Sequence, residues 1–130
     1  MRNLCFIGAG RHAQANILPA ALAAGVDVAG IATRHRESAQ AATGRFGGNP
    51  YDDWQRMLDT EACDGVVVVA QPDDQLALTL AWSARKKPVW GEKPVGCTAA
   101  RVVQAAEAGR KTGTRVMVGL MKRYAPVYLE

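Results

Sequence analysis

Apolar and polar positions change in blocks along this chain, and the blocks differ in their period. Short apolar runs of the kind that form strands are separated by longer segments with helical spacing. The runs are residues 3–7, 26–33, 65–70, 88–91 and 115–121. The run at 65–70 (GVVVVA) has four consecutive valines, and a run without alternation predicts a strand buried on both faces, as in a parallel sheet.

The segments between these runs predict helices. They cover residues 12–24, 35–46, about 53–60, a segment opened by Pro72, and about 98–111. Residues 47–50 (GGNP) combine turn-forming residues and predict a loop. Regular alternation of strand and helix predicts an α/β fold. We therefore expect one domain, residues 1–130, with a Rossmann-type doubly wound parallel sheet of about six strands in a three-layer α/β/α arrangement.

A glycine-rich turn joins the first predicted strand to the first predicted helix. Residues 8–13 read Gly8-Ala9-Gly10-Arg11-His12-Ala13 and fit the pattern G-x-G-x-x-G/A. In this strand–turn–helix context the pattern predicts a dinucleotide site, with the pyrophosphate at the helix N-terminus. An ordinary glycine-rich turn is the alternative, and His12 is expected to be a helix-start residue rather than a catalytic one.

The second strand ends in basic residues. The sequence there is Ala32-Thr33-Arg34-His35-Arg36, without the Asp or Glu that commonly binds the ribose of NAD. Thr33 can donate a hydrogen bond, and Arg34 and Arg36 can pair with a 2′-phosphate. This pattern favours NADP, with NAD as the alternative cofactor; a solvated basic helix start is the competing interpretation.

An acid, a base and a proline follow the strand predicted at residues 88–91. Glu92-Lys93-Pro94 comes directly after residues 88–91. Ligands of open parallel sheets bind at the carboxyl ends of the strands. Lys93 would then lie near a bound nicotinamide, where a lysine can donate a proton or a hydrogen bond to a substrate oxygen. Glu92 can accept bonds from ribose hydroxyls.

Three motifs together resemble those of the glucose–fructose oxidoreductase / inositol dehydrogenase / MocA family. They are the glycine turn, Glu92-Lys93-Pro94, and residues 119–126 (GLMKRYAP), which fit the family pattern G-x-x-x-R-x-x-P. The resemblance implies an N-terminal NAD(P)-binding domain that oxidises or reduces a hydroxyl or carbonyl carbon of a sugar, polyol or related compound. It also implies that Lys93 is catalytic, that Glu92 lies by the nicotinamide ribose, and that Arg123 lies near the cofactor end of the site.

Two features depart from the family pattern. Where the family commonly has T-P-N-x-x-H, this chain has Gln71-Pro72-Asp73-Asp74-Gln75. Gln71, Pro72 and Gln75 are still expected at the cofactor, and Gln75 can form hydrogen bonds but cannot titrate near neutral pH. The second departure is length, because family members continue into a second α/β domain that supplies most substrate contacts. We expect that domain to be absent here, which predicts exposed apolar surface near residues 121–129 and self-association.

Composition limits the classes of partner that we expect. The net charge is +4, from 16 basic and 12 acidic residues, and no long Lys/Arg run suggests nucleic-acid binding. No apolar stretch approaches the roughly 20 residues of a membrane span. The odd number of cysteines, three and widely spaced, predicts free thiols in a reducing cytoplasm, and no spacing predicts a metal site.

Two classes of function remain open. The first is an NAD(P)-dependent oxidoreductase domain that supplies the catalytic Lys93. The alternative is a dinucleotide-binding module, or a truncated fragment, without turnover of its own. The Glu-Lys-Pro motif favours the first, because a pure binding module does not need it; the stop at Glu130 favours the second.

Overall fold

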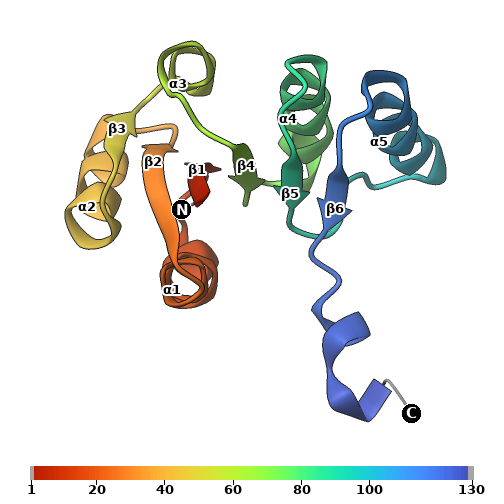
Figure 1. The fold of residues 1–130 in the computed structure, drawn as a ribbon, viewed down its shortest axis with the longest axis horizontal. Coiled ribbons are helices and arrows are strands. Elements are labelled where there is room, and N and C mark those ends of the chain that lie inside the picture. The colour runs from red at the N-terminus through yellow and green to blue at the C-terminus, as the bar shows by residue number, and fades with distance from the viewer. Residues whose placement is uncertain (1, 129–130) are drawn as a thin grey trace.

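The computed structural model describes residues 2–128 and shows a parallel sheet with helices on both faces (Figure 1). In this part of the chain the strands follow the order β3-β2-β1-β4-β5-β6, and every neighbouring pair is parallel. The strands are β1 (Arg2–Ile7), β2 (Val26–Ala32), β3 (Asn49–Tyr51), β4 (Gly65–Val68), β5 (Val89–Gly91) and β6 (Val116–Val118). This is the doubly wound Rossmann order, so the predicted fold class is confirmed.

The helices lie where the polar periodicity predicts them. They are η1, a π-helical segment (Ala13–Ile17) that continues into α1 (Leu18–Ala23), then α2 (Arg36–Phe46), α3 (Trp54–Thr60), α4 (Pro72–Ala84) and α5 (Ala99–Thr112). Two short 3₁₀ turns follow β6, namely η2 (Met121–Tyr124) and η3 (Pro126–Tyr128).

Local signals in the sequence set the helix ends. The Asp53 carboxylate accepts the backbone N–H of Gln55 at 2.8 Å and caps α3. The Thr98 hydroxyl accepts the N–H of Arg101 and caps α5. Gly113 closes α5 with a left-handed backbone conformation, φ 69°.

Strand β3 was not predicted. Asn49–Tyr51 lies in a segment that the sequence marks as a loop, yet it pairs in parallel with β2, with Gly30 opposite Asn49. Because β3 is at the edge of the sheet, Pro50 can lie in it without supplying a backbone donor to a second neighbour. The prediction of a loop at residues 47–50 was therefore wrong at Asn49 and Pro50.

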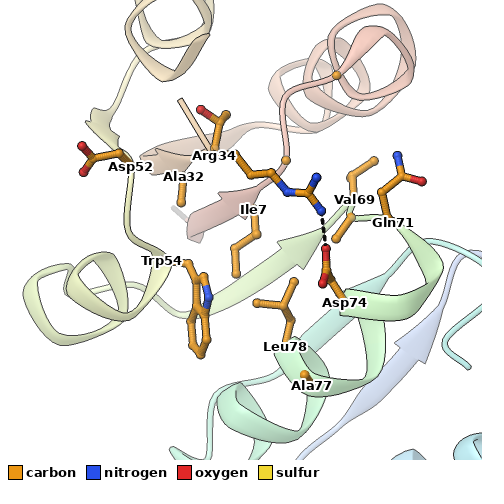
Figure 2. Close-up of a pocket in the computed structure, with 14 residues that line it drawn as sticks. Ile7, Ala32, Arg34, Asp52, Trp54, Val69, Gln71, Asp74, Ala77 and Leu78 are labelled. Carbon is orange, nitrogen blue, oxygen red and sulfur yellow. Dashed lines mark hydrogen bonds and ion pairs between the residues drawn. The ribbon is translucent and has the colours of Figure 1, made fainter. Parts of the chain in front are cut away.

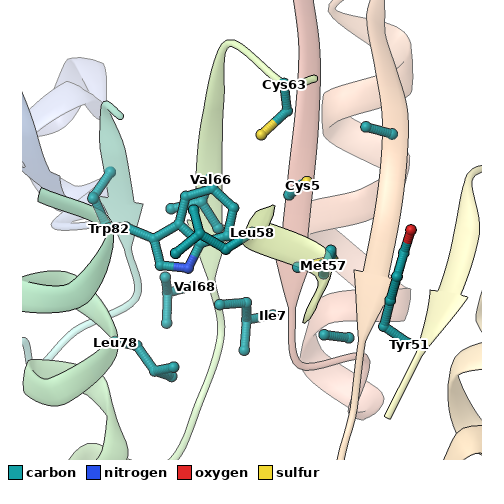
Figure 3. Close-up of a cluster of buried hydrophobic side chains, with 13 residues drawn as sticks. Cys5, Ile7, Tyr51, Met57, Leu58, Cys63, Val66, Val68, Leu78 and Trp82 are labelled. Atoms are coloured by element: carbon teal, nitrogen blue, oxygen red, sulfur yellow. The ribbon is translucent and has the colours of Figure 1, made fainter. Parts of the chain in front are cut away.

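Two apolar clusters hold the sheet between its helical layers. On one face of the sheet, side chains of α3 and α4 pack against β1 and β4 (Figure 3). The helices contribute Met57, Leu58, Leu78 and Trp82 to this cluster. On the other face, η1, α1 and α2 pack against the same strands through residues that include Ala13, Leu18 and Ala42. Strand β4, which holds three of the four consecutive valines, supplies both clusters, so it is buried on both faces as predicted.

Two of the cysteines meet inside the first cluster. Cys5 and Cys63 are both buried, and Cys97 is exposed. A hydrogen bond between the two buried sulfurs lowers the pKa of Cys63 to about 7 and raises the pKa of Cys5, which burial raises further. The positive charge of Lys87 also lowers the pKa of Cys63. All three thiols are free.

The sheet face against which η1 and α1 pack is incompletely covered by helices near β6. Met117, Leu120, Met121, Tyr124 and Val127 are exposed there, and Figure 1 shows that the chain after β6 extends away from the layers. Apolar exposure was predicted near residues 121–129, and it is present at the described residues of that range; Leu129 and Glu130 lie outside the described residues. Self-association through this surface stays a prediction.

Within residues 2–128, every helix is too short or too polar to cross a membrane.

Candidate functional site

The glycine turn closes the carboxyl end of β1 against β4. Gly8 has φ 91°, and a Cβ atom there would lie 2.1 Å from the carbonyl oxygen of Val69. Gly8 also donates its N–H to Ala32 at 2.8 Å, which ties the turn to the end of β2. Three strand ends thus meet around Gly8, and only glycine fits there without displacing backbone.

Gly10 has a different surrounding. A Cβ atom at Gly10 would meet no protein atom within 4 Å, so packing within the chain does not require glycine at this position. Gly10 lines two adjoining pockets. Beyond it, the first intrahelical bond runs from Gln14 N to Gly10 O at 3.0 Å, which leaves the preceding N–H groups of the helix free to bind an anion. These features fit a diphosphate group lying over Gly10.

The first of these pockets, which we call the Arg34 pocket, has a volume of about 490 Å³ (Figure 2). It lies between the carboxyl ends of β1, β2 and β4 and the start of α4. Apolar side chains line much of it and include Ile7, Val69 and Leu78, with Trp54 from α3. An apolar cavity with a few polar groups at its mouth suits a purine nucleoside.

Several polar groups of the Arg34 pocket already have partners within the chain. The Arg34 guanidinium donates to Asp74 of α4, with 2.7 Å between Nη2 and Oδ2. The Thr33 hydroxyl donates to the carbonyl of His35 at 2.6 Å. Asp52, just after β3, also lines this pocket. No acid follows β2 directly, but the pocket still contains two carboxylates. Asp52 follows β3, and Asp74 lies in the first turn of α4.

The second pocket, the Lys93 pocket, has a volume of about 360 Å³ and shares Gly10, Val69, Ala70 and Gln71 with the first. The remaining residues that line it are Arg11, His12, Ala13, Glu92, Lys93 and Met121. The glycine turn and the Glu-Lys-Pro motif, about 80 residues apart in the chain, thus face one cavity. The Lys93 side chain is exposed there, and the Lys93–Pro94 peptide bond is cis.

A hydrogen-bonded chain connects the helix start to Glu92. Glu92 Oε1 lies 3.2 Å from His12 Nε2, and Asn16 Nδ2 lies 3.2 Å from His12 Nδ1. Glu92 Oε2 accepts the backbone N–H of Lys93 at 3.0 Å. His12 is at the helix start, as predicted, but its side chain also holds Glu92, a contact that the sequence motif does not reveal.

Gln75 lies behind the site rather than in it. It is almost fully buried, with 1% of its surface exposed. Its amide donates to Val68 O at 3.1 Å and accepts the N–H of Ala70 at 3.2 Å. Both of its bonds go to the backbone of the segment that lines the two pockets, so Gln75 supports that segment instead of facing the cavity.

The structure brings most of the predicted site residues together. Gly8, Gly10, Arg11, His12, Ala13, Thr33, Arg34, Gln71, Glu92 and Lys93 line one or both pockets. Four others do not line them: Pro72 starts α4, Gln75 is buried, Arg36 lies 3.9 Å from Asp52, and Arg123 is exposed on η2.

Two carboxylates at the Arg34 pocket were not predicted as site residues. Asp74 was expected in the first turn of a helix, where the structure places it, and its side chain also reaches the pocket. Asp52 follows the strand that was taken for a loop. Recognising β3 would have identified Asp52, because it then lies at a carboxyl strand end.

A third, apolar cavity of about 570 Å³ adjoins the Lys93 pocket on the exposed side of β6. Trp90, Met117, Leu120 and Tyr124 line it together with Glu92. Among residues 2–128, no group of three or more His, Cys, Asp or Glu side chains is arranged to hold a metal ion.

Comparison with known proteins agrees with this geometry. Residues 2–120 match the model of an oxidoreductase family with an NAD-binding Rossmann fold. An inositol 2-dehydrogenase of Acidothermus cellulolyticus is 38% identical over 78 residues, which are 59% of this chain and 23% of that protein. The rhizopine catabolism protein MocA of Rhizobium meliloti is 27% identical over 123 residues, 95% of this chain and 38% of that protein.

A solved structure has the same fold. The open form of KijD10, a 3-ketoreductase from Actinomadura kijaniata in complex with TDP-benzene and NADP, superimposes with a TM-score of 0.91 at 25% identity. The match covers 98% of this chain and 40% of KijD10. This chain thus spans about two-fifths or less of the relatives that it matches. Taken with the glycine turn and the Glu-Lys-Pro motif on one cavity, these matches show that the chain belongs to the glucose–fructose oxidoreductase / inositol dehydrogenase / MocA family and carries its N-terminal NAD-binding Rossmann domain.

Proposed function

We propose that this chain binds NADP, or NAD as the alternative, and supplies the catalytic lysine, Lys93, of an oxidoreductase. The proposal depends on one observation above all: Lys93 and the glycine turn line the same cavity. A dinucleotide laid over Gly10 would place its adenosine in the Arg34 pocket and its nicotinamide in the Lys93 pocket.

The cofactor supplies the hydride acceptor or donor. The chain's own contribution at the reacting carbon is Lys93, whose ammonium group can donate a hydrogen bond or a proton to a substrate oxygen that gains negative charge on reduction. In the oxidative direction Lys93 is the group placed to take up the proton of the hydroxyl. Glu92, whose Oε1 lies 3.2 Å from His12 Nε2, would accept hydrogen bonds from the nicotinamide ribose.

The substrate class is inferred from the relatives. They include an inositol 2-dehydrogenase and a 3-ketoreductase crystallised with TDP-benzene and NADP. We therefore propose a hydroxyl or carbonyl group on a sugar, a cyclic polyol or a related compound as the reacting centre.

Calorimetric titration with NADPH and, separately, with NADH at one fixed ionic strength tests this function. We expect both to bind, NADPH more tightly, and Arg34→Ala to weaken NADPH binding about tenfold or more through loss of a charged phosphate contact. Arg110→Ala is the matched control, because Arg110 is exposed in the last turn of α5, outside both pockets. A folded chain that binds neither dinucleotide would refute the proposal.

A further inference from the structure

One ion pair spans the mouth of the Arg34 pocket. Arg34 follows β2 and Asp74 lies in the first turn of α4, 40 residues later, and both side chains line the cavity. Figure 2 shows the guanidinium extended across the opening toward the Asp74 carboxylate. The cation proposed to bind a 2′-phosphate is therefore already bonded to an anion.

The same pairing occurs at the other arginine. Arg36 Nη1 lies 3.9 Å from Asp52 Oδ1, and Asp52 is part of the pocket lining. Of the two pairs, the Arg34–Asp74 pair has the shorter distance and has both partners in the lining. Asp74 is thus the carboxylate placed best to act on whatever Arg34 binds.

The Arg34–Asp74 pair is exposed, with 74% and 51% of the two side chains accessible. Exposed ion pairs contribute little to stability, so the fold does not depend on this contact. A ligand phosphate at Arg34, however, would carry its charge next to the Asp74 carboxylate. A ribose hydroxyl in the same place would instead find an acceptor for its hydrogen bond.

We propose that Asp74 is a specificity-determining residue that weakens binding of the 2′-phosphorylated cofactor and so keeps the pocket open to the unphosphorylated one. This inference rests on the proposed function, since it assumes that the adenosine ribose lies beside Arg34. Asp74 acts in two ways: it competes with the phosphate for the guanidinium, and its charge repels the phosphate.

Two adenosine ligands isolate the effect. Adenosine 2′,5′-bisphosphate and adenosine 5′-monophosphate differ only in the 2′-phosphate, and neither needs the nicotinamide half of the site. The test measures the Kd of each for the purified chain, for Asp74→Asn and for Asp73→Asn by calorimetry at fixed, low ionic strength. Asp73 is the matched control: it lies in the same helical turn, loses the same charge, and pairs at 3.7 Å with Arg101, outside the pocket.

We expect Asp74→Asn to bind the bisphosphate about tenfold more tightly, the effect of removing one unit charge a few ångströms from a phosphate near the surface. Its affinity for the monophosphate should be unchanged or weaker. Asp73→Asn should change both by less than twofold. Thermal unfolding of each variant checks that the fold is retained.

The possible failures are distinguishable. If the bisphosphate binds, Arg34→Ala weakens it, and Asp74→Asn leaves it unchanged, the role of Asp74 is refuted and the proposed function stands. An equal gain in Asp73→Asn would assign the effect to net charge and would also refute the inference. If neither these ligands nor the dinucleotides bind the folded chain, both the inference and the proposed function are overturned.

Discussion

Replacing Gln75 by leucine tests how the pocket segment is supported. The substitution keeps the approximate size of a buried side chain and removes its two bonds to the backbone. Val68 O keeps a partner, because it also accepts the N–H of Glu92 at 2.8 Å. Ala70 N loses the Gln75 acceptor.

The magnitude follows from these two bonds. The part-buried N–H of Ala70 costs about 1–3 kcal/mol when it loses its acceptor, and the lost bond to Val68 adds about 1 kcal/mol. The extra apolar surface of leucine offsets about 1 kcal/mol of this loss. The net expectation is a loss of about 2 kcal/mol in the free energy of unfolding, or a fall of about 7 °C in Tm for a domain of this length.

Thermal and urea unfolding followed by circular dichroism measure both quantities. Gln104→Leu is the control, because Gln104 is exposed on α5 and undergoes the same chemical change. We also expect Gln75→Leu to weaken dinucleotide binding, since Ala70 and Gln71 line both pockets. A Gln75→Leu protein as stable as Gln104→Leu would show that the buried amide does not support the segment, and the argument would be wrong.

Two further predictions concern the core. Burial and the hydrogen bond to the Glu61 carboxylate raise the pKa of Tyr51 from 10 to about 12, so the stabilisation is complete below pH 10 and is lost as the pH rises to 12. Tyr51→Phe should therefore lower the free energy of unfolding at pH 8, measured by urea, by about 1–2 kcal/mol. Between pH 10 and 12 the variant should lose less stability than the parent protein. Equal losses in both proteins would contradict this. Of the three thiols only Cys97 is exposed, so a disulfide reagent should label one thiol rapidly in the native chain and three in denaturant, and Cys97→Ser should abolish the rapid phase; a second rapid thiol in the native chain would disagree with the burial of the other two.

Much of the fold was predictable because its signals are local. Local signals of this kind are the valine run at 66–69, the caps Asp53 and Thr98, and the closing Gly113, each of which acts within a few residues. Strand β3 was missed for the same reason. Gly47-Gly48-Asn49-Pro50 has the local composition of a loop, and its strand conformation comes from pairing with β2 at the sheet edge.

The candidate site, like the fold, has features that the local sequence predicts and features that only the tertiary structure decides. Sequence context alone predicted that the glycine turn and Lys93 share one edge of the sheet, because a parallel sheet places all carboxyl strand ends there, and the two do line one cavity. It predicted Gln75 as a cofactor residue, whereas the tertiary structure gives its amide to the backbone. No local signal shows which way a side chain in the first turn of a helix points.

The sequence by itself thus determined the fold class, the family and the edge of the sheet where the candidate site lies, since these depend on periodicity and on motifs a few residues long. Only the tertiary structure decided the charge balance within the site. The pairs Arg34–Asp74 and His12–Glu92 join residues 40 and 80 positions apart. Such pairs form because strand order and helix placement bring separate strand ends together. The spacing of two residues along the chain does not show that their side chains lie close in space.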